Sequence, residues 1–265
     1  MTLAVLTAIA ALVALTGCTS ASRPTLDDER SPATTASRGQ SAADPLTRSP
    51  TSATPASPAP GGSLIAQAVV PLVAVYEHPD AAAPIRRFEN PWFVNDDARY
   101  PVDTVFLAQE QRNGWVRVLL PVRPNGSTGW VRATDVRLVP NRFRIEVDLG
   151  DHALTVYDGD QVLVRDTVAV GKPETPTPVG TFYLRVLLQA PDPTTVYGPY
   201  AYGLSSHSEA LDEFNGGDAE IGIHGNNDPS LLGRSVSAGC IRMDNEKITR
   251  LAGLLPLGTP VEVRA

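Results

Sequence analysis

Two side chains in the C-terminal half of the chain have the chemistry of a nucleophile and its base. Cys240 lies in the segment 237–243, SAGCIRM, and His224 lies sixteen positions earlier in the segment 221–225, IGIHG. The only other cysteine, Cys18, ends an apolar leader, so Cys240 has no plausible disulfide partner in the mature chain. Its thiol is therefore either an inert core group or a reactive one.

A cysteine thiol needs a neighbouring base or cation to react at neutral pH, because a pKa near 8.5 leaves only about 3% thiolate at pH 7. His224 is the candidate base. Pairing that lowers the pKa of the thiol to about 6 would give roughly 90% thiolate. The two residues can meet if His224 ends one strand and Cys240 begins the next. Gly239, without a Cβ, lets a substrate approach and can adopt a positive φ.

Neighbouring groups have candidate supporting roles. The backbone N–H groups of Gly239 and Cys240 are natural donors to the oxyanion of a tetrahedral intermediate. Ser237 can support the site through its hydroxyl, or it is a simple hydroxyl at a strand end. Arg242, two residues after Cys240, points to the same side of a strand and suits a substrate carboxylate, or it forms a structural ion pair. Tyr202 is a candidate for a substrate groove, with hydrophobic filling as the alternative.

The elements that must position these groups are mostly strands. Apolar and polar residues alternate from Phe143 to Leu149, which predicts a half-buried strand, and further strands are expected at 153–157, 162–170, 181–186 and 261–263. Asp244 can cap one helix whose apolar face contains Ile248, Leu251 and Leu255. The long segment 187–203 is a candidate lid over the site. A mainly β domain is predicted over residues 141–265.

A second β domain is predicted over residues 64–139. The run Gly-Trp-Val-Arg at 114–117 returns at 129–132, with a strand and a turn between the copies, as a small antiparallel barrel requires. The spacing resembles bacterial SH3-like domains. Trp115 and Trp130 fill the barrel core in one interpretation and line a groove for wall peptides in the other.

The N-terminal 63 residues have the composition of a targeting segment and a tether. Residues 1–18 resemble the signal peptide of bacterial lipoproteins, ending in LTGC, which implies cleavage before Cys18 and lipidation of its thiol. The alternative is a secretory peptide with an incidental cysteine. Residues 19–63, rich in Ser, Thr, Pro and Ala, are expected to be disordered. The expected location is extracytoplasmic, lipid-anchored to the cell membrane and reaching the wall.

The segment from about 143 to 264 resembles the YkuD-type catalytic domain of L,D-transpeptidases, bacterial enzymes that cross-link peptidoglycan. The matching motifs, in order, are the opening strand pair, TPVGTF at 177–182, IHG at 223–225 and SAGCIRM. The resemblance implies a mainly β fold, in which an SH3-like barrel precedes a β-sandwich catalytic domain with one or two short helices. Many members carry a second histidine where this chain has Ala238.

The same resemblance implies a mechanism. Cys240 would attack the carbonyl of the third residue of a tetrapeptide stem, release D-Ala and form a thioester that an amine of another stem resolves, giving a 3-3 cross-link. His224 would manage the protons, and the carbonyl of Gly225 would orient its ring. No metal or organic cofactor is implied. The expected partners are stem peptides, the membrane through the lipid, and carbapenem-type inhibitors, with a monomeric enzyme.

Other functions remain open on sequence alone. Water as acceptor would make the protein an L,D-carboxypeptidase, and a protein amine would make it an anchoring enzyme. Papain-like and NlpC/P60-type peptidases place the cysteine before the histidine, the reverse of the order here, and sortases carry their arginine farther from the cysteine. A zinc site of His207, His224 and Cys240 lacks a close ligand pair. The alternative of another class is a non-catalytic wall-binding lipoprotein. The formal net charge of -7 argues against a nucleic-acid partner.

Overall fold

The computed structural model describes residues 57–58, 61–94, 100–214 and 216–265. The predicted signal peptide, the lipidation site Cys18 and nearly all of the predicted tether lie outside the described residues, so these expectations stay predictions. No helix in the described part of the chain is long and apolar enough to cross a membrane.

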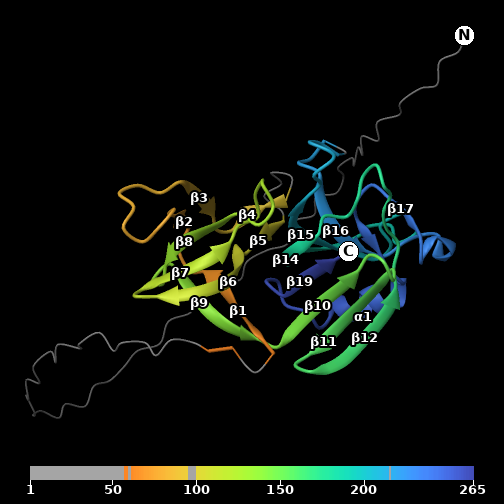
Figure 1. The fold of residues 1–265 in the computed structure, drawn as a ribbon, viewed down its shortest axis with the longest axis horizontal. Coiled ribbons are helices and arrows are strands. Elements are labelled where there is room, and N and C mark those ends of the chain that lie inside the picture. Colours follow the sequence, from red (N-terminus) through yellow and green to blue (C-terminus); the bar gives the residue numbers. More distant parts are fainter. Residues whose placement is uncertain (1–56, 59–60, 95–99, 215) are drawn as a thin grey trace, which may run out of the picture. The chain divides into compact units, whose positions relative to one another are not determined.

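The first part of the described chain is antiparallel β structure. Its strands are β1 (Ser63–Ala68), β2 (Leu72–Val75), β3 (Arg86–Glu89), β4 (Trp92–Phe93), β5 (Pro101–Val102), β6 (Val105–Arg112), β7 (Trp115–Leu119), β8 (Thr128–Arg132) and β9 (Val136–Asn141). Five of them form one sheet in the order β8-β7-β6-β1-β9 (Figure 1). Below, residues 61–141 are called the barrel; its SH3-like class stays a prediction.

The repeated Gly-Trp-Val-Arg runs form paired neighbours in this sheet. Strands β7 and β8 are antiparallel, with Trp115 opposite Arg132 and Arg117 opposite Trp130. Valines of both copies, Val116 and Val131, are buried in the core of the barrel. Trp130 is also buried, which favours the interpretation of this tryptophan as a core residue.

The second part of the described chain is predominantly β, as predicted. Its elements are β10 (Phe143–Asp148), β11 (Ala153–Asp158), β12 (Gln161–Thr167), β13 (Val170–Gly171), β14 (Gly180–Gln189), β15 (Tyr200–His207), β16 (Glu220–His224), the 3-10 helix η2 (Pro229–Leu231), β17 (Ser235–Ser237), β18 (Ile241–Arg242), α1 (Asn245–Ala252) and β19 (Pro260–Arg264). Eight strands form one sheet in the order β12-β11-β10-β19-β14-β15-β16-β18, and β13 pairs with β17.

The eight-stranded sheet curls at β14. The first residues of β14, Gly180–Tyr183, pair with β19, whereas residues from Leu184 to Gln189 pair with β15, and the register with β15 shifts between Leu184 and Val186. The predicted β-sandwich is thus a single curled sheet around one core. That core contains the buried alternate residues of β10, Ile145 and Val147.

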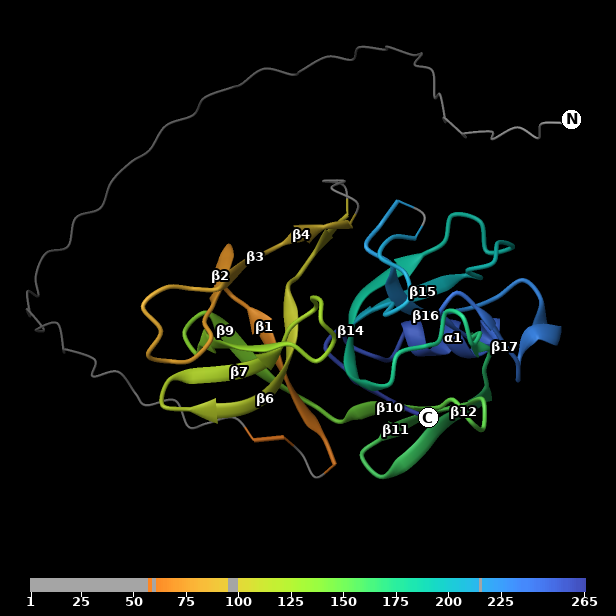
Figure 2. The same cartoon turned by 45° about the horizontal axis from the view of Figure 1, so that its top comes forward.

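Helix α1 begins where the sequence places its cap. The carboxylate of Asp244 accepts hydrogen bonds from the N–H groups of Glu246 and Lys247. Ile248 and Leu251 face the core, and the helix contacts β15 (Figure 2). Because α1 follows β18 almost directly, it anchors the segment that contains Cys240.

The barrel and the curled sheet share a small hydrophobic cluster. Ile65, Val105, Leu107 and Leu119 of the barrel pack with Tyr183 of β14. The predicted boundary near residue 140 therefore separates two sheets that nevertheless bury apolar surface together.

Candidate active site

His224 ends a strand, as the sequence analysis supposed, but Cys240 lies just before a strand rather than at its start, and the short strand β17 comes between the two. His224 is the last residue of β16, and Cys240 precedes β18. The two strands are parallel neighbours, with Ile223 opposite Ile241 and His224 opposite Arg242. This pairing brings together residues sixteen positions apart.

Both residues line one cleft with a volume of about 170 Å³. Two more of the predicted site residues, Ser237 and Arg242, also line it, as does Ala238 at the position of the family's second histidine. The other walls come from the loop before β15 and from the loop between β15 and β16. The lining residues from these loops and from β16 are Val196, Tyr197, Ser208, Leu211, Phe214, Ala219, Glu220 and Ile221.

The ring of His224 is buried and held from two sides. Its Nδ1 lies 2.7 Å from the carbonyl oxygen of Gly225, which is the predicted contact. Since a carbonyl only accepts, Nδ1 carries the proton and Nε2 is the basic nitrogen of the neutral ring. The ring of Tyr197 packs beside it, with centroids 5.1 Å apart. Burial lowers the pKa of His224 to about 4, despite opposing contacts to the backbone of Gly225 and Val196.

Burial also dominates the thiol of Cys240. It raises the pKa of Cys240, and the backbone of Gly222 and the charge of Arg242 only partly oppose it. Burial thus favours the neutral forms of both the thiol and the imidazole, and the pairing that would lower the pKa of the thiol to about 6 stays a hypothesis. Among the described residues, the hydrogen bonds of His224 and Cys240 run to backbone groups rather than between the two side chains. Proton transfer must accompany the attack.

The turn before Cys240 is fixed by Ser237. Its hydroxyl donates to the carbonyl of Cys240 at 2.6 Å and accepts from the N–H of Gly239 at 3.1 Å. Gly239 has the expected positive φ, 121°, and a Cβ there would lie 2.8 Å from Cδ1 of Ile221. Because the Gly239 N–H already has an acceptor, its prediction as a free oxyanion donor is wrong. Of the two predicted donors, the Cys240 N–H is the remaining candidate.

Two threonines also support this turn, and sequence reasoning missed them. Thr177 donates from its hydroxyl to the carbonyl of Gly239 at 2.7 Å, and Thr175 donates to the carbonyl of Ser237 at 3.1 Å. Both side chains are buried. The run at 177–182 entered the sequence analysis only as a motif of the family resemblance, and nothing in the sequence links its threonine to the turn before Cys240.

Arg242 and Gly225 occupy positions that constrain the cleft. Arg242 lines the cleft, and its buried Nε has no hydrogen-bond partner among the described residues. A Cβ on Gly225 would lie 2.2 Å from Oδ1 of Asn245. That same oxygen accepts from the N–H of Asn226 at 2.8 Å, so the turn after His224 is packed directly onto the start of α1.

Comparison with known proteins now decides the family. The model of the YkuD L,D-transpeptidase catalytic domain matches residues 142–263. A Bacillus licheniformis protein named L,D-transpeptidase YkuD is 33% identical over 154 residues, covering 56% of this chain and 85% of the relative. The chain belongs to the L,D-transpeptidase family. The Bacillus subtilis YkuD protein is 35% identical over 121 residues, 46% of this chain and 65% of its own length.

A solved L,D-transpeptidase from Mycobacterium tuberculosis H37Rv is also similar. It is 16% identical, covers 69% of this chain and 70% of its own, and has a TM-score of 0.40.

Within this L,D-transpeptidase domain, the structure corrects the role predicted for Tyr202. The residue is only 1% exposed, and its hydroxyl donates to the carbonyls of Leu251 and Leu255 at the end of α1. It is a core residue that anchors the helix, not a groove residue. Tyr197, in the loop between β14 and β15, lines the cleft instead.

The zinc alternative also fails in the described part of the chain. His207 pairs through Nε2 with Asp218 at 3.2 Å, and no group of three or more histidine, cysteine or acidic side chains among the described residues is arranged for a metal ion. His207 belongs instead to a contact with the barrel.

Proposed function

We propose that this protein is a cysteine-dependent peptidoglycan L,D-transpeptidase that forms 3-3 cross-links in wall biogenesis. The observation that carries the proposal is the single cleft in which Cys240, His224 and Arg242 meet in a member of this family. A nucleophile, a neutral base and a cation in one partly closed site suit acyl transfer from a peptide donor.

In the first half-reaction, Sγ of Cys240 attacks the carbonyl carbon of the third stem residue while Nε2 of His224 takes the thiol proton. The neutral imidazole supports this step, because a protonated ring could not accept. The N–H of Cys240 is the proposed donor to the oxyanion. The C–N bond to D-Ala then breaks, His224 returns its proton to the departing amine, and a thioester remains.

In the second half-reaction, a side-chain amine of another stem attacks the thioester carbonyl. His224 accepts a proton from the attacking amine and returns it to the sulfur of Cys240 as the C–S bond breaks. The balance requires no metal or redox cofactor, because the energy of the peptide bond is conserved in the thioester. Arg242, which lines the cleft, is proposed to bind a carboxylate or carbonyl of the donor through its guanidinium.

The acceptor decides between this function and its alternatives. Incubation with a purified disaccharide-tetrapeptide, followed by product masses, distinguishes them: a 3-3 dimer indicates a transpeptidase, and a tripeptide product alone indicates an L,D-carboxypeptidase. A protein product requires an added protein amine. Unchanged tetrapeptide together with binding to isolated walls would favour a non-catalytic wall-binding protein and contradict the proposal.

We also propose that the protein is lipid-anchored outside the cytoplasm through Cys18. The LTGC run carries this proposal, and wall peptides are the substrate such a location supplies. Metabolic labelling with a fatty-acid probe should label the wild-type chain but not Cys18→Ala.

A further inference from the structure

The loop between β15 and β16, residues 208–219, is called the cleft wall below. It contributes Ser208, Leu211, Phe214 and Ala219 to the cleft that holds Cys240. At its base the N–H of Ser208 donates to the carbonyl of Ala219 at 2.9 Å. Within its described residues, the loop has local hydrogen bonds from Ala210 and Leu211 to the Ser208 hydroxyl and a bridge between Phe214 and Gly217. Contacts from outside the loop add to these.

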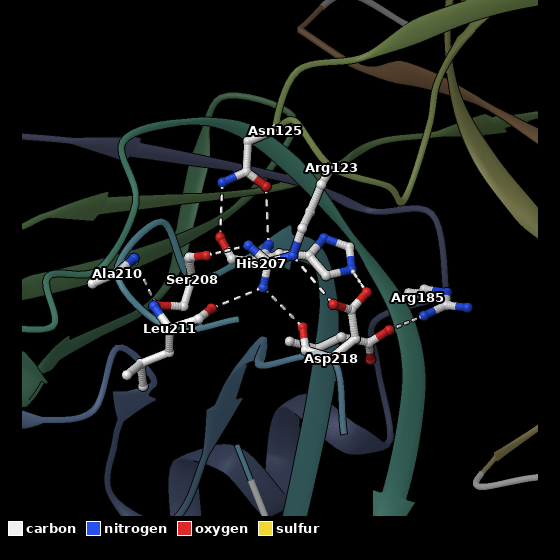
Figure 3. Close-up of polar contacts among 9 residues, drawn as sticks. Arg123, Asn125, Arg185, His207, Ser208, Ala210, Leu211 and Asp218 are labelled. Atoms are coloured by element: carbon white, nitrogen blue, oxygen red, sulfur yellow. Dashed lines mark hydrogen bonds and ion pairs between the residues drawn. The ribbon is translucent and has the colours of Figure 1, made fainter. Parts of the chain in front are cut away.

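One of those contacts is Arg123 of the barrel, which reaches three points along the wall. Its guanidinium donates to the carbonyl of Ser208, to the carbonyl of Leu211 at 2.9 Å, and to both the carbonyl and the carboxylate of Asp218, each at 3.2 Å (Figure 3). The planar fork of arginine can serve several acceptors at once, which the single ammonium of lysine cannot do with the same geometry.

Asn125 holds the start of the same loop. Its side-chain amide donates to the carbonyl of His207 at 2.8 Å and accepts from the N–H of His207 at 2.9 Å, like a strand partner (Figure 3). His207 in turn contacts Asp218. Arg123 and Asn125 therefore bind both arms of the loop.

A separate barrel contact reaches the residue that follows the wall. Trp92 stacks under the guanidinium of Arg185, 4.0 Å from the ring centroid, and Arg185 forms an ion pair with Glu220, another residue of the cleft. Barrel side chains therefore contact this part of the cleft in two ways: Arg123 and Asn125 bind the cleft wall directly, and Trp92 acts through Arg185 on Glu220.

We propose that Arg123 is a positioning residue of the L,D-transpeptidase reaction, through which the barrel holds the cleft wall in the conformation that binds the donor stem. This inference rests on the proposed function. Without the guanidinium, the carbonyls of Ser208 and Leu211 lose their donor, and Leu211 and Phe214 are free to leave the cleft. The barrel is then part of the catalytic unit rather than only a spacer or a wall-binding module.

The test compares Arg123→Ala, Arg123→Lys and Asn125→Ala with the wild type. The matched control is Arg117→Ala, because Arg117 is an exposed barrel arginine that donates only to Thr128 within the barrel. Each variant is assayed for kcat and KM of D-Ala release, for Tm, and for hydrogen exchange of the segment 208–219.

The expected result for Arg123→Ala is a KM raised about tenfold with kcat changed less than about threefold, since the wall binds substrate but carries no chemistry. Exchange of the wall amides should become faster. Arg123→Lys should restore these values only in part, Asn125→Ala should shift them in the same direction, and Arg117→Ala should match the wild type. A general loss of stability would not produce this separation of KM from kcat.

The inference would be overturned if folded Arg123→Ala had the wild-type KM or the wild-type hydrogen exchange of the cleft-wall amides. It would also be overturned if Arg123→Lys had the wild-type KM and exchange. If Arg123→Ala does not fold, Arg123→Lys and Asn125→Ala decide by the same criteria. If the wild type releases no D-Ala, the proposed function fails first. The inference is then decided by exchange and by the rate of Cys240 alkylation: both should change in Arg123→Ala, and unchanged values contradict it.

Discussion

Lowering the pH from 7 to 5.5 should leave kcat/KM for the donor stem almost unchanged. The pH dependence of kcat/KM reports the free enzyme, in which burial lowers the pKa of His224 to about 4. With that pKa about 97% of the imidazole is still neutral at pH 5.5, whereas a histidine with the ordinary pKa of about 6.5 would be only about 9% neutral. The two cases differ about tenfold in available base at pH 5.5.

The assay is D-Ala release at low substrate concentration, in a buffer series from pH 4 to 7.5 at constant ionic strength. The expected profile is flat above about pH 5 and falls toward tenfold per unit only below about pH 4. A control series with enzyme returned to pH 7 separates titration from acid denaturation. An acid limb near pH 6.5 would refute the description of His224 as a buried, neutral base.

Further predictions concern the same site. The pKa of His224 is lower in the folded than in the unfolded state, so the unfolded state binds more protons between about pH 4 and 6.5. The free energy of unfolding should therefore fall by about 3 kcal/mol as the pH falls through this window. In His224→Asn the fall should be smaller. Because burial raises the pKa of Cys240, its alkylation by iodoacetamide should rise up to pH 8.5 without a plateau; a plateau below pH 7 would indicate a resting thiolate. Ser237→Ala should lower the free energy of unfolding in urea by about 1–3 kcal/mol and should lower kcat, and Ser237→Thr should lie nearer to the wild type. If the two variants lose the same stability and activity, the hydroxyl does not hold the turn. Gly239→Ala should destabilise the fold by about 1–3 kcal/mol, because this position has a positive φ and a Cβ there would contact Ile221. An unchanged Tm would contradict this strain.

The sequence predicted the strands and the meeting of the two reactive residues. Period-two alternation defines β10, and the order of motifs places His224 at a strand end and Cys240 before the next strand. The carbonyl contact of Gly225 was implied by the family resemblance, since a glycine leaves only its backbone to orient the ring. These features are local, so they can be inferred without knowing the packing.

The errors concern burial, which depends on distant segments. Burial raises the pKa of Cys240, and motif chemistry alone cannot tell how deeply a thiol is buried. For Tyr202 the sequence left a groove and hydrophobic filling open, and its side chain points toward α1, so the second applies. The contacts of Arg123 with a loop 85 or more positions away have no sequence signal at all.

The most direct test of the central claim is the mass of the enzyme during turnover. Wild-type protein mixed with a tetrapeptide donor, without acceptor, and quenched in acid should gain the mass of the donor minus D-Ala, and digestion should map the adduct to the peptide that contains Cys240. Cys240→Ala should show neither the adduct nor D-Ala release. Turnover by Cys240→Ala, or an adduct on another residue, would contradict the assignment of Cys240 as the acyl-transfer nucleophile.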